Sequence, residues 1–322
     1  MNSTQALSWV LFNIFIVAML VLDLKVLHRK PHLIGIRESL LETAGWIALA
    51  LAFNVLIYFT SGRQTALEFL TGYLIEKSLS VDNLFVFLVL FNYFGVPSKY
   101  QHNVLFWGIV GAIFMRGAFI LGGIALISRL HAVIYVFGAF LVFTGIKLAF
   151  QKEKEVHPEK NPVFRFMRRF FPLTERFEGD RFAVRRDAKI LFTPLFVVLV
   201  MIESMDIVFA VDSIPAIFAV TLNPFIVYSS NMFAILGLRS LYFALAGMMH
   251  MFHYLSHGLS FVLVFIGVKM LLTDFYKIPI GAALLIVLGT LATSVVASLL
   301  FPPAKPVFPP DMVPKEEDFT EE

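Results

Sequence analysis

Long apolar stretches, separated by short polar segments, set the pattern of this chain. Nine of the apolar stretches reach the roughly 20 residues that a helix needs to cross a bilayer. They lie near residues 7–27, 40–60, 66–93, 103–127, 131–150, 190–219, 225–249, 257–273 and 278–300. Because so much Leu, Val, Ile and Phe leaves these helices no polar face, the pattern predicts an all-α, polytopic transmembrane helical bundle of about nine spans.

Composition and the distribution of basic residues add an orientation to this picture. Charged residues make up 15% of the chain, compared with about 25% in soluble domains. Segment 151–189 alone carries eleven lysines and arginines. Since cytoplasmic loops are enriched in both residues, we place this basic loop inside, together with residues 28–39. Counting spans outward from it puts the N-terminus outside and the C-terminus in the cytoplasm.

The basic loop has a second interpretation, because such segments can also bind lipid headgroups or nucleic acid. The same segment contains seven acids, so we prefer the topological interpretation and expect no nucleic-acid partner. Beyond the last span, residues 301–322 are rich in proline and acidic residues. This composition predicts a disordered tail.

Charged positions in the middle of the chain occur twice in the same order. Without gaps, Glu76-Lys-Ser-Leu-Ser-Val-Asp82-Asn83 aligns with Asp206-Ile-Val-Phe-Ala-Val-Asp212-Ser213. An arginine and then a lysine follow each motif: Arg116 and Lys147 in the first copy, Arg239 and Lys269 in the second. The spacing from arginine to lysine is 31 residues in one copy and 30 in the other. We infer an internal repeat.

Each copy contains three predicted spans, 66–150 in repeat A and 190–275 in repeat B. Three is odd, and one cytoplasmic loop joins the copies, so the second copy must enter the membrane from the opposite face. Inverted three-helix repeats of this kind build secondary transporters, whose substrate sites lie near the midplane at the repeat interface. Residues 1–60 then form two N-terminal helices, and 278–300 forms a final one.

Five carboxylates lie deep inside two of these stretches, where they should be surrounded by hydrocarbon: Glu76, Asp82, Glu203, Asp206 and Asp212. Each charged group at the bilayer centre costs about 2.5–3.5 kcal/mol on insertion scales, so each requires a partner, a cavity or an ion. Arg116 and Arg239 are mid-span and are the natural counterions, and Lys147 and Lys269 near span ends either compensate charge or snorkel. Two arginines against five acids leave negative charge that a divalent cation would offset. Purely structural ion pairs are the alternative.

Other oxygen donors accompany these acids. Asn83, Ser213 and Asn231 supply side-chain oxygens, and Pro215 predicts a helix break that would free backbone carbonyls beside Asp212. Carboxylates, amides and carbonyls suit Mg²⁺, Ca²⁺ or Mn²⁺. The chain has no cysteine, and its eight histidines lie in loops or at span ends, which disfavours zinc and copper. We expect a transporter rather than an enzyme, with no catalytic residues and no catalytic cofactor.

Three strings resemble signature motifs of the TerC family, a group of bacterial integral membrane proteins named for tellurium resistance. They are Leu70-Thr-Gly-Tyr-Leu-Ile-Glu-Lys-Ser-Leu-Ser-Val-Asp-Asn83, Phe209-Ala-Val-Asp-Ser-Ile-Pro-Ala-Ile-Phe-Ala-Val220 and Ser230-Asn-Met-Phe-Ala-Ile-Leu-Gly-Leu-Arg-Ser240. The resemblance covers roughly residues 1–300 and is strongest to the Alx-type branch. It implies manganese export, and proposed links to metalation of secreted proteins and to membrane-protein biogenesis. By motif position it implies the functional set Glu76, Asp82, Asn83, Glu203, Asp206, Asp212, Ser213 and Asn231.

These observations lead to one hypothesis and two rivals. The hypothesis is a bacterial inner-membrane exporter of Mn²⁺ that works by alternating access, with midplane carboxylates as ligands. The first rival is a transporter of another cation or of protons, because a carboxylate cluster serves those equally well. The second is a biogenesis or metalation partner of secretion or membrane-insertion machinery, in which the acids are structural and the basic loop carries the interaction.

Overall fold

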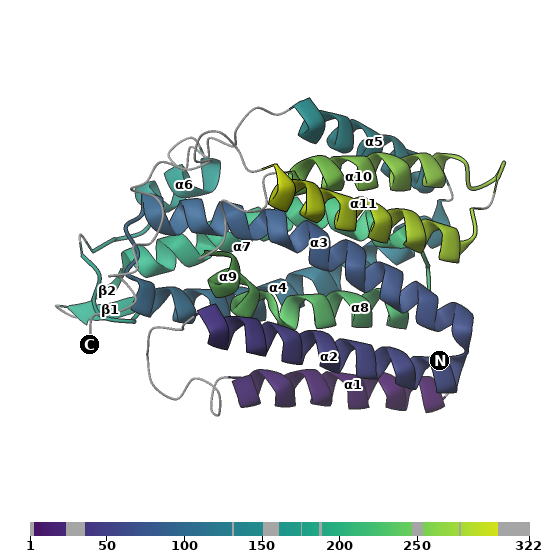
Figure 1. Cartoon of the computed structure of the whole chain (residues 1–322). Coiled ribbons are helices and arrows are strands. Elements are labelled where there is room, and N and C mark those ends of the chain that lie inside the picture. The colour runs from purple at the N-terminus through teal and green to yellow at the C-terminus, as the bar shows by residue number, and fades with distance from the viewer. Residues whose placement is uncertain are drawn as a thin grey trace.

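Helices form nearly all of the part of the chain that the computed structural model describes, namely residues 3–23, 36–130, 132–150, 161–174, 176–186, 189–246, 254–276 and 278–301. The predicted tail beyond residue 301, and residues 151–160 of the basic loop, lie outside these ranges. In chain order the elements are α1 (Ser3–Leu22), α2 (Ile36–Ser61), α3 (Arg63–Tyr93), α4 (Ser98–Arg129), α5 (Val133–Phe150), α6 (Pro162–Phe170), β1 (Ala183–Arg186), β2 (Lys189–Phe192), α7 (Pro194–Phe218), α8 (Pro224–Leu236), α9 (Leu238–Ala246), α10 (Leu255–Leu271) and α11 (Ile280–Leu300). The two strands pair as an antiparallel hairpin at one end of the bundle (Figure 1).

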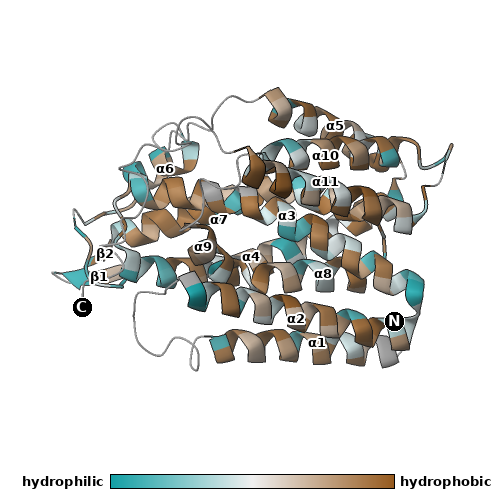
Figure 2. Cartoon of the chain, viewed as in Figure 1, coloured by the Kyte–Doolittle hydropathy of each residue, from teal (hydrophilic) through white to brown (hydrophobic). Residues whose placement is uncertain are grey.

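The helices have the character of membrane spans. Among the described residues, five are long and apolar enough to cross a bilayer: Arg37–Ser61 within α2, and the whole of α4, α5, α7 and α11. Shorter apolar helices lie at Ala6–Leu22, Pro224–Leu236 and Leu255–Leu271. Hydrophobic residues dominate the helices, while hydrophilic ones gather around α6, β1 and β2 (Figure 2). A membrane protein of the all-α class, mostly helical with one short hairpin, is therefore confirmed, whereas the count of nine spans stays a prediction.

Local sequence signals explain where several helices begin. Proline occupies the first position of α6, α7 and α8, where its missing N–H would have had no partner. The side chain of Asn161 accepts a hydrogen bond from the backbone N–H of Val163 at 2.8 Å, and Asn223 accepts one from Phe225 at 3.1 Å. These asparagine caps satisfy N–H groups that the helix itself leaves free.

The break predicted at Pro215 is wrong, because α7 continues through it from Pro194 to Phe218. Pro215 stands in the last turn, where the helix gives up only the bond to the carbonyl of Val211 before it ends. An interruption falls instead at Gly237, between α8 and α9. A Cβ there would lie 2.9 Å from the Lys77 ammonium and 3.0 Å from Trp46 Cβ, so glycine lets α2 and α3 approach this bend.

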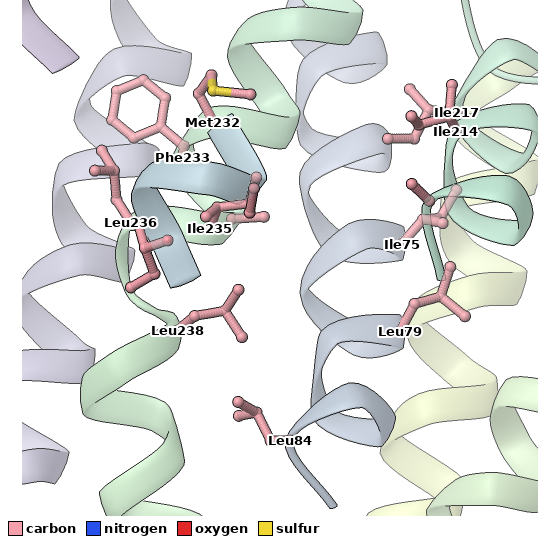
Figure 3. Close-up of a cluster of buried hydrophobic side chains, with 14 of the residues drawn as sticks. Ile75, Leu79, Leu84, Ile214, Ile217, Met232, Phe233, Ile235, Leu236 and Leu238 are labelled. Carbon is pink, nitrogen blue, oxygen red and sulfur yellow. The ribbon is translucent and has the colours of Figure 1, made fainter. Parts of the chain in front are cut away.

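Helix α3 is central to the bundle and lies between α7 and α8. In Figure 3, Ile75 of α3 lies beside Ile214 and Ile217 of α7, whereas Ile235 and Leu238 lie on the other side of α3. Helix α4 packs against both α7 and α8, α2 covers α3 and α9, and α11 covers α3 and α10. The first three-helix set, α3 to α5, is thus interleaved with α7 to α10 rather than standing apart from it.

Small residues bring α5 and α10 into close contact. A Cβ on Gly138 would lie 3.0 Å from the carbonyl oxygen of Gly267, and one on Gly145 would lie 2.9 Å from that of Ser260. Contact positions rise along α5 as they fall along α10, so the two helices run antiparallel. Ser260 also donates a hydrogen bond to the Gly145 carbonyl at 2.6 Å. Small residues and interhelical hydrogen bonds are the usual means of joining helices in a membrane.

Gly267→Ala should destabilise the protein, because the new methyl group would stand 2.7 Å from the Gly138 carbonyl oxygen and 2.8 Å from the Val142 backbone nitrogen. Overpacking of this kind costs about 1–3 kcal/mol. Thermal unfolding of purified protein in detergent should show a clear decrease in Tm. Gly289→Ala is the matched control, because nothing lies within 4 Å of a Cβ there. Equal Tm values for the two variants would contradict this packing.

Candidate functional site

A fully buried arginine in the middle of α4 organises the polar interior. Arg116 is 0% exposed. Its Nη1 donates to Oε1 of Glu76 on α3. Its Nε and Nη2 donate to the two carboxylate oxygens of Asp206 on α7, at 3.1 and 2.8 Å. One guanidinium therefore joins two helices through two acids, and the bond to Asp206 is bidentate, the strongest arrangement for this pair.

Two neutral side chains complete the Arg116 cluster, which comprises Glu76, Arg116, Asp206, Ser213 and Asn231. The Asn231 amide, on α8, donates to Oε2 of Glu76 at 3.1 Å and accepts from Arg116 Nη1 at 3.4 Å. The Ser213 hydroxyl on α7 accepts from Nη1 at 3.5 Å. All five residues are buried. Two carboxylates facing one guanidinium give the cluster a formal charge of −1 when both acids are ionised.

The remaining predicted donors lie around this cluster. Asp212 is half-buried on α7 and accepts a hydrogen bond from the Thr144 hydroxyl of α5 at 3.3 Å. Asn83 is buried on α3. Asp82 belongs to the same helix, but its side chain lies outside the described part of the chain.

Glu203 lies on α7, three residues before Asp206. Its carboxylate rests against Gly111 of α4, where a Cβ would stand 2.1 Å from Oε1. This oxygen is buried and has no hydrogen-bond partner among the residues that the structure describes. A buried acceptor without a donor is costly. Glycine at position 111 leaves room for this carboxylate, because a Cβ there would collide with it.

No ready-made metal centre is present in the described ranges, since no three histidine or acidic side chains there converge as metal ligands do. Glu76 and Asp206 instead face a guanidinium. An arginine lies between the two carboxylates and offsets one of their two negative charges.

A second charged cluster surrounds Arg239 on α9, which the sequence alignment pairs with Arg116. Arg239 donates to Oδ1 of Asp23, directly after α1, and contacts His102 Nε2 of α4 at 2.6 Å. The sequence indicated neither partner, because Asp23 and His102 have no counterparts in the predicted repeat. The one signal in the sequence was a lone acid near the end of the first apolar stretch.

A small cavity lies between the two clusters. Its volume is about 20 Å³, and its lining includes both Asp206 and Arg239. This is enough for about one water molecule. Leu84, Phe87 and Ile202 supply apolar walls. Asp206, already bonded to Arg116, therefore also faces the space next to the second arginine.

Both predicted lysines lie apart from the acids. Lys147 is exposed on α5 and Lys269 is half-buried on α10, each in the last turn of its helix. Neither side chain joins the Arg116 cluster in the described structure. Snorkelling toward the membrane surface is compatible with these positions.

Comparison with known proteins adds a family to this geometry. Residues 61–305 match the model of the "Integral membrane protein TerC family". An "Uncharacterized membrane protein STKORF319" of Myxococcus xanthus is 50% identical over 91% of this chain and 92% of its own. The "Putative membrane-bound redox modulator Alx" of Escherichia coli K12 is 46% identical over 88% of this chain and 92% of its own. No solved structure matches the chain.

Arg116→Leu should be poorly tolerated, because it leaves Glu76 and Asp206 buried without a cation. Breaking a buried pair in this way costs about 3–5 kcal/mol. Fluorescence-detected gel filtration in detergent should show little monodisperse protein. Arg129→Leu, at the exposed end of the same helix, should behave like the unmodified chain.

A triple variant tests whether charge is the cause. Adding Glu76→Gln and Asp206→Asn to Arg116→Leu removes the uncompensated charges and should restore much of the monodisperse peak. If Arg116→Leu folds normally without them, the cluster does not stabilise the bundle.

Proposed function

This chain belongs to the TerC family of integral membrane proteins, and from that premise we propose that it exports a divalent cation, most directly Mn²⁺, from the cytoplasm. The observation that carries the proposal is the buried acid pair, Glu76 and Asp206, held by Arg116 between α3 and α7. Ionisable residues inside a membrane bundle mark ion pathways by default. Oxygen donors predominate around the pair, as a hard divalent cation prefers.

The acid pair is shared by the two copies of the repeat. Glu76 and Asp206 hold equivalent positions in the alignment, and one guanidinium binds both. A cation entering between them would therefore interact with both halves of the molecule at once. This is the location that inverted-repeat transporters use for their substrates.

Contacts between α5 and α10 support an inverted repeat. The alignment of Gly145 with Gly267 also relates Gly138 to Ser260. Under this alignment, the close approach of Gly145 to Ser260 corresponds to the close approach of Gly267 to Gly138. Equivalent helices that run antiparallel are expected when the two-fold axis lies in the membrane plane, whereas parallel repeats would place them parallel. We therefore keep nine spans and two inverted three-helix repeats as the proposed topology.

Arg116 gives this transporter a cation-free resting state. In the mechanism we propose, Mn²⁺ displaces the guanidinium from Glu76 and Asp206 and draws on oxygens from Asp82, Asp212 and neighbouring amides. Arg116 returns when the ion leaves, so the acids are never left unpaired in the membrane. Alternating access then follows from rocking one repeat against the other.

The proposed location and membrane orientation of the chain rest on the basic loop. We propose an inner-membrane protein with its N-terminus outside and its C-terminus in the cytoplasm, because segment 151–189 is basic.

The Escherichia coli relative is named for redox modulation. This chain has no cysteine and so offers no thiol for disulfide exchange, which is why we place its activity in ion movement.

Asp212→Asn should abolish Mn²⁺ transport while leaving the fold intact, because it keeps the side-chain size and removes a charge. Purified protein in liposomes that contain a manganese-sensitive dye should show a decrease of at least about tenfold in rate. Asp82→Asn should do the same. Asp274→Asn is the matched control, because Asp274 is an acid bonded to Tyr135 rather than a member of the predicted ligand set. Unchanged rates in well-folded Asp82→Asn and Asp212→Asn proteins would rule out the proposed ligands.

Orientation can be measured with single cysteines, since the chain has none. Gln64, in the first turn of α3, should be outside and Arg181 inside, and both are exposed. A membrane-impermeant thiol reagent applied to spheroplasts should label Gln64→Cys and spare Arg181→Cys until the cells are lysed. Labelling of both, or of Arg181→Cys alone, would overturn the topology.

A further inference from the structure

Helix α6 is held against the bundle by one apolar face. Met167 is buried, and the Phe164 ring lies 5.6 Å from that of Phe94 at the end of α3. Directly after the helix, the Phe171 ring lies 6.3 Å from that of Phe196 in the first turn of α7. Because α7 is one of the candidate spans, these contacts fix α6 beside the point where a helix enters the membrane (Figure 1).

The exposed remainder of α6, here called its outer face, combines exposed aromatic rings with positive charge. It comprises Arg165, Phe166, Arg168, Arg169 and Phe170, all exposed. Phe166 is 55% and Phe170 62% exposed, with ring centroids 4.7 Å apart. The Arg169 guanidinium lies 5.6 Å over the Phe170 ring. No acidic residue occurs in the helix.

Helical geometry places these groups in order around α6. With about 100° of rotation per residue, Phe166 and Phe170 lie on one flank of Met167, Arg165 and Arg169 lie opposite it, and Arg168 lies on its other flank. A helix with phenylalanine on one flank and arginine on the next is arranged to lie in a bilayer interface, with rings in the acyl boundary and guanidinium groups among phosphates.

The surroundings of α6 extend this pattern. Residues 161–192 carry eight lysines and arginines and four acids. On the β1–β2 hairpin, Arg185 pairs in register with Ile190, which is 59% exposed. Hydrophilic residues concentrate at this end of the bundle (Figure 2). An anionic membrane surface would therefore face net positive charge here. Exposed apolar side chains beside that charge could insert into the surface.

We propose that the outer face of α6 docks on the surface of the protein's own bilayer and binds anionic phospholipid headgroups. An acidic protein partner would meet the same charges. The bilayer is favoured because the contacts of Phe171 hold α6 at the start of a span, where headgroups are within reach without any partner. Transport is not assumed, so this docking and the ion-export proposal stand or fall separately.

The test uses the full chain in lipid nanodiscs with a spin label on Phe170→Cys. In phosphatidylglycerol discs the label should be accessible to oxygen, which dissolves in lipid, and protected from an aqueous nickel chelate. In phosphatidylcholine discs protection should decline because the headgroups carry no net charge. In anionic discs at 1 M salt it should decline because screening weakens the attraction.

Arginine variants show whether charge drives docking. Adding Arg165→Gln, Arg168→Gln and Arg169→Gln should lower the ratio of docked to undocked label by about 100-fold, since each basic residue near an anionic surface contributes about fivefold. The matched triple lysine variant should stay docked. A label that is equally open to nickel in both lipids, with or without the arginines, would overturn the proposal. Protection that appears only after a soluble protein is added would also overturn it and assign the face to that partner.

Discussion

The polar interior depends on compensating the charges of two buried carboxylates, Glu76 and Asp206, which would otherwise repel each other. Arg116 does this with a single planar group whose donors reach both acids. Guanidinium is suited to this task because its charge is permanent and its donors form a rigid fork. Asn231 and Ser213 then occupy the remaining positions of the cluster. The helices around it, α3, α4, α7 and α8, are the ones that must stay in register for these bonds to exist.

The sequence predicted what depends on local pattern. Apolar runs of spanning length became helices, because the period and length of hydrophobic residues are local properties. The acids and Arg116 could be singled out because charge within an apolar run is conspicuous. Their exact pairing could not, since it requires the relative rotation of α3, α4 and α7. Alignment alone favoured two equivalent arginines, whereas Arg239 binds Asp23 and His102, which come from outside the repeated positions.

Two backbone features show where sequence rules mislead. Proline at position 215 suggested an interrupted helix, but its place in the final turn of α7 makes the lost hydrogen bond inexpensive. Glycine at position 237 gave no comparable warning, because isolated glycines occur throughout membrane helices. Its importance follows from Trp46 and Lys77, which approach it from α2 and α3. A residue's effect on a helix thus depends on what packs against it as much as on its own propensity.

The shared arginine also sets an order for biosynthesis. Glu76 and Arg116 are 40 residues apart on adjacent helices, so α3 and α4 can leave the translocon as a hairpin whose charges already match. Asp206 follows Arg116 by 90 residues, a delay of roughly 5–18 s at bacterial and eukaryotic rates of about 5–20 residues per second. During that interval the Nε edge of the Arg116 guanidinium does not yet have the Asp206 carboxylate to bind. When α7 arrives, the Asp206 carboxylate meets a cation that is already in the membrane, so its charge is compensated as this apolar helix inserts.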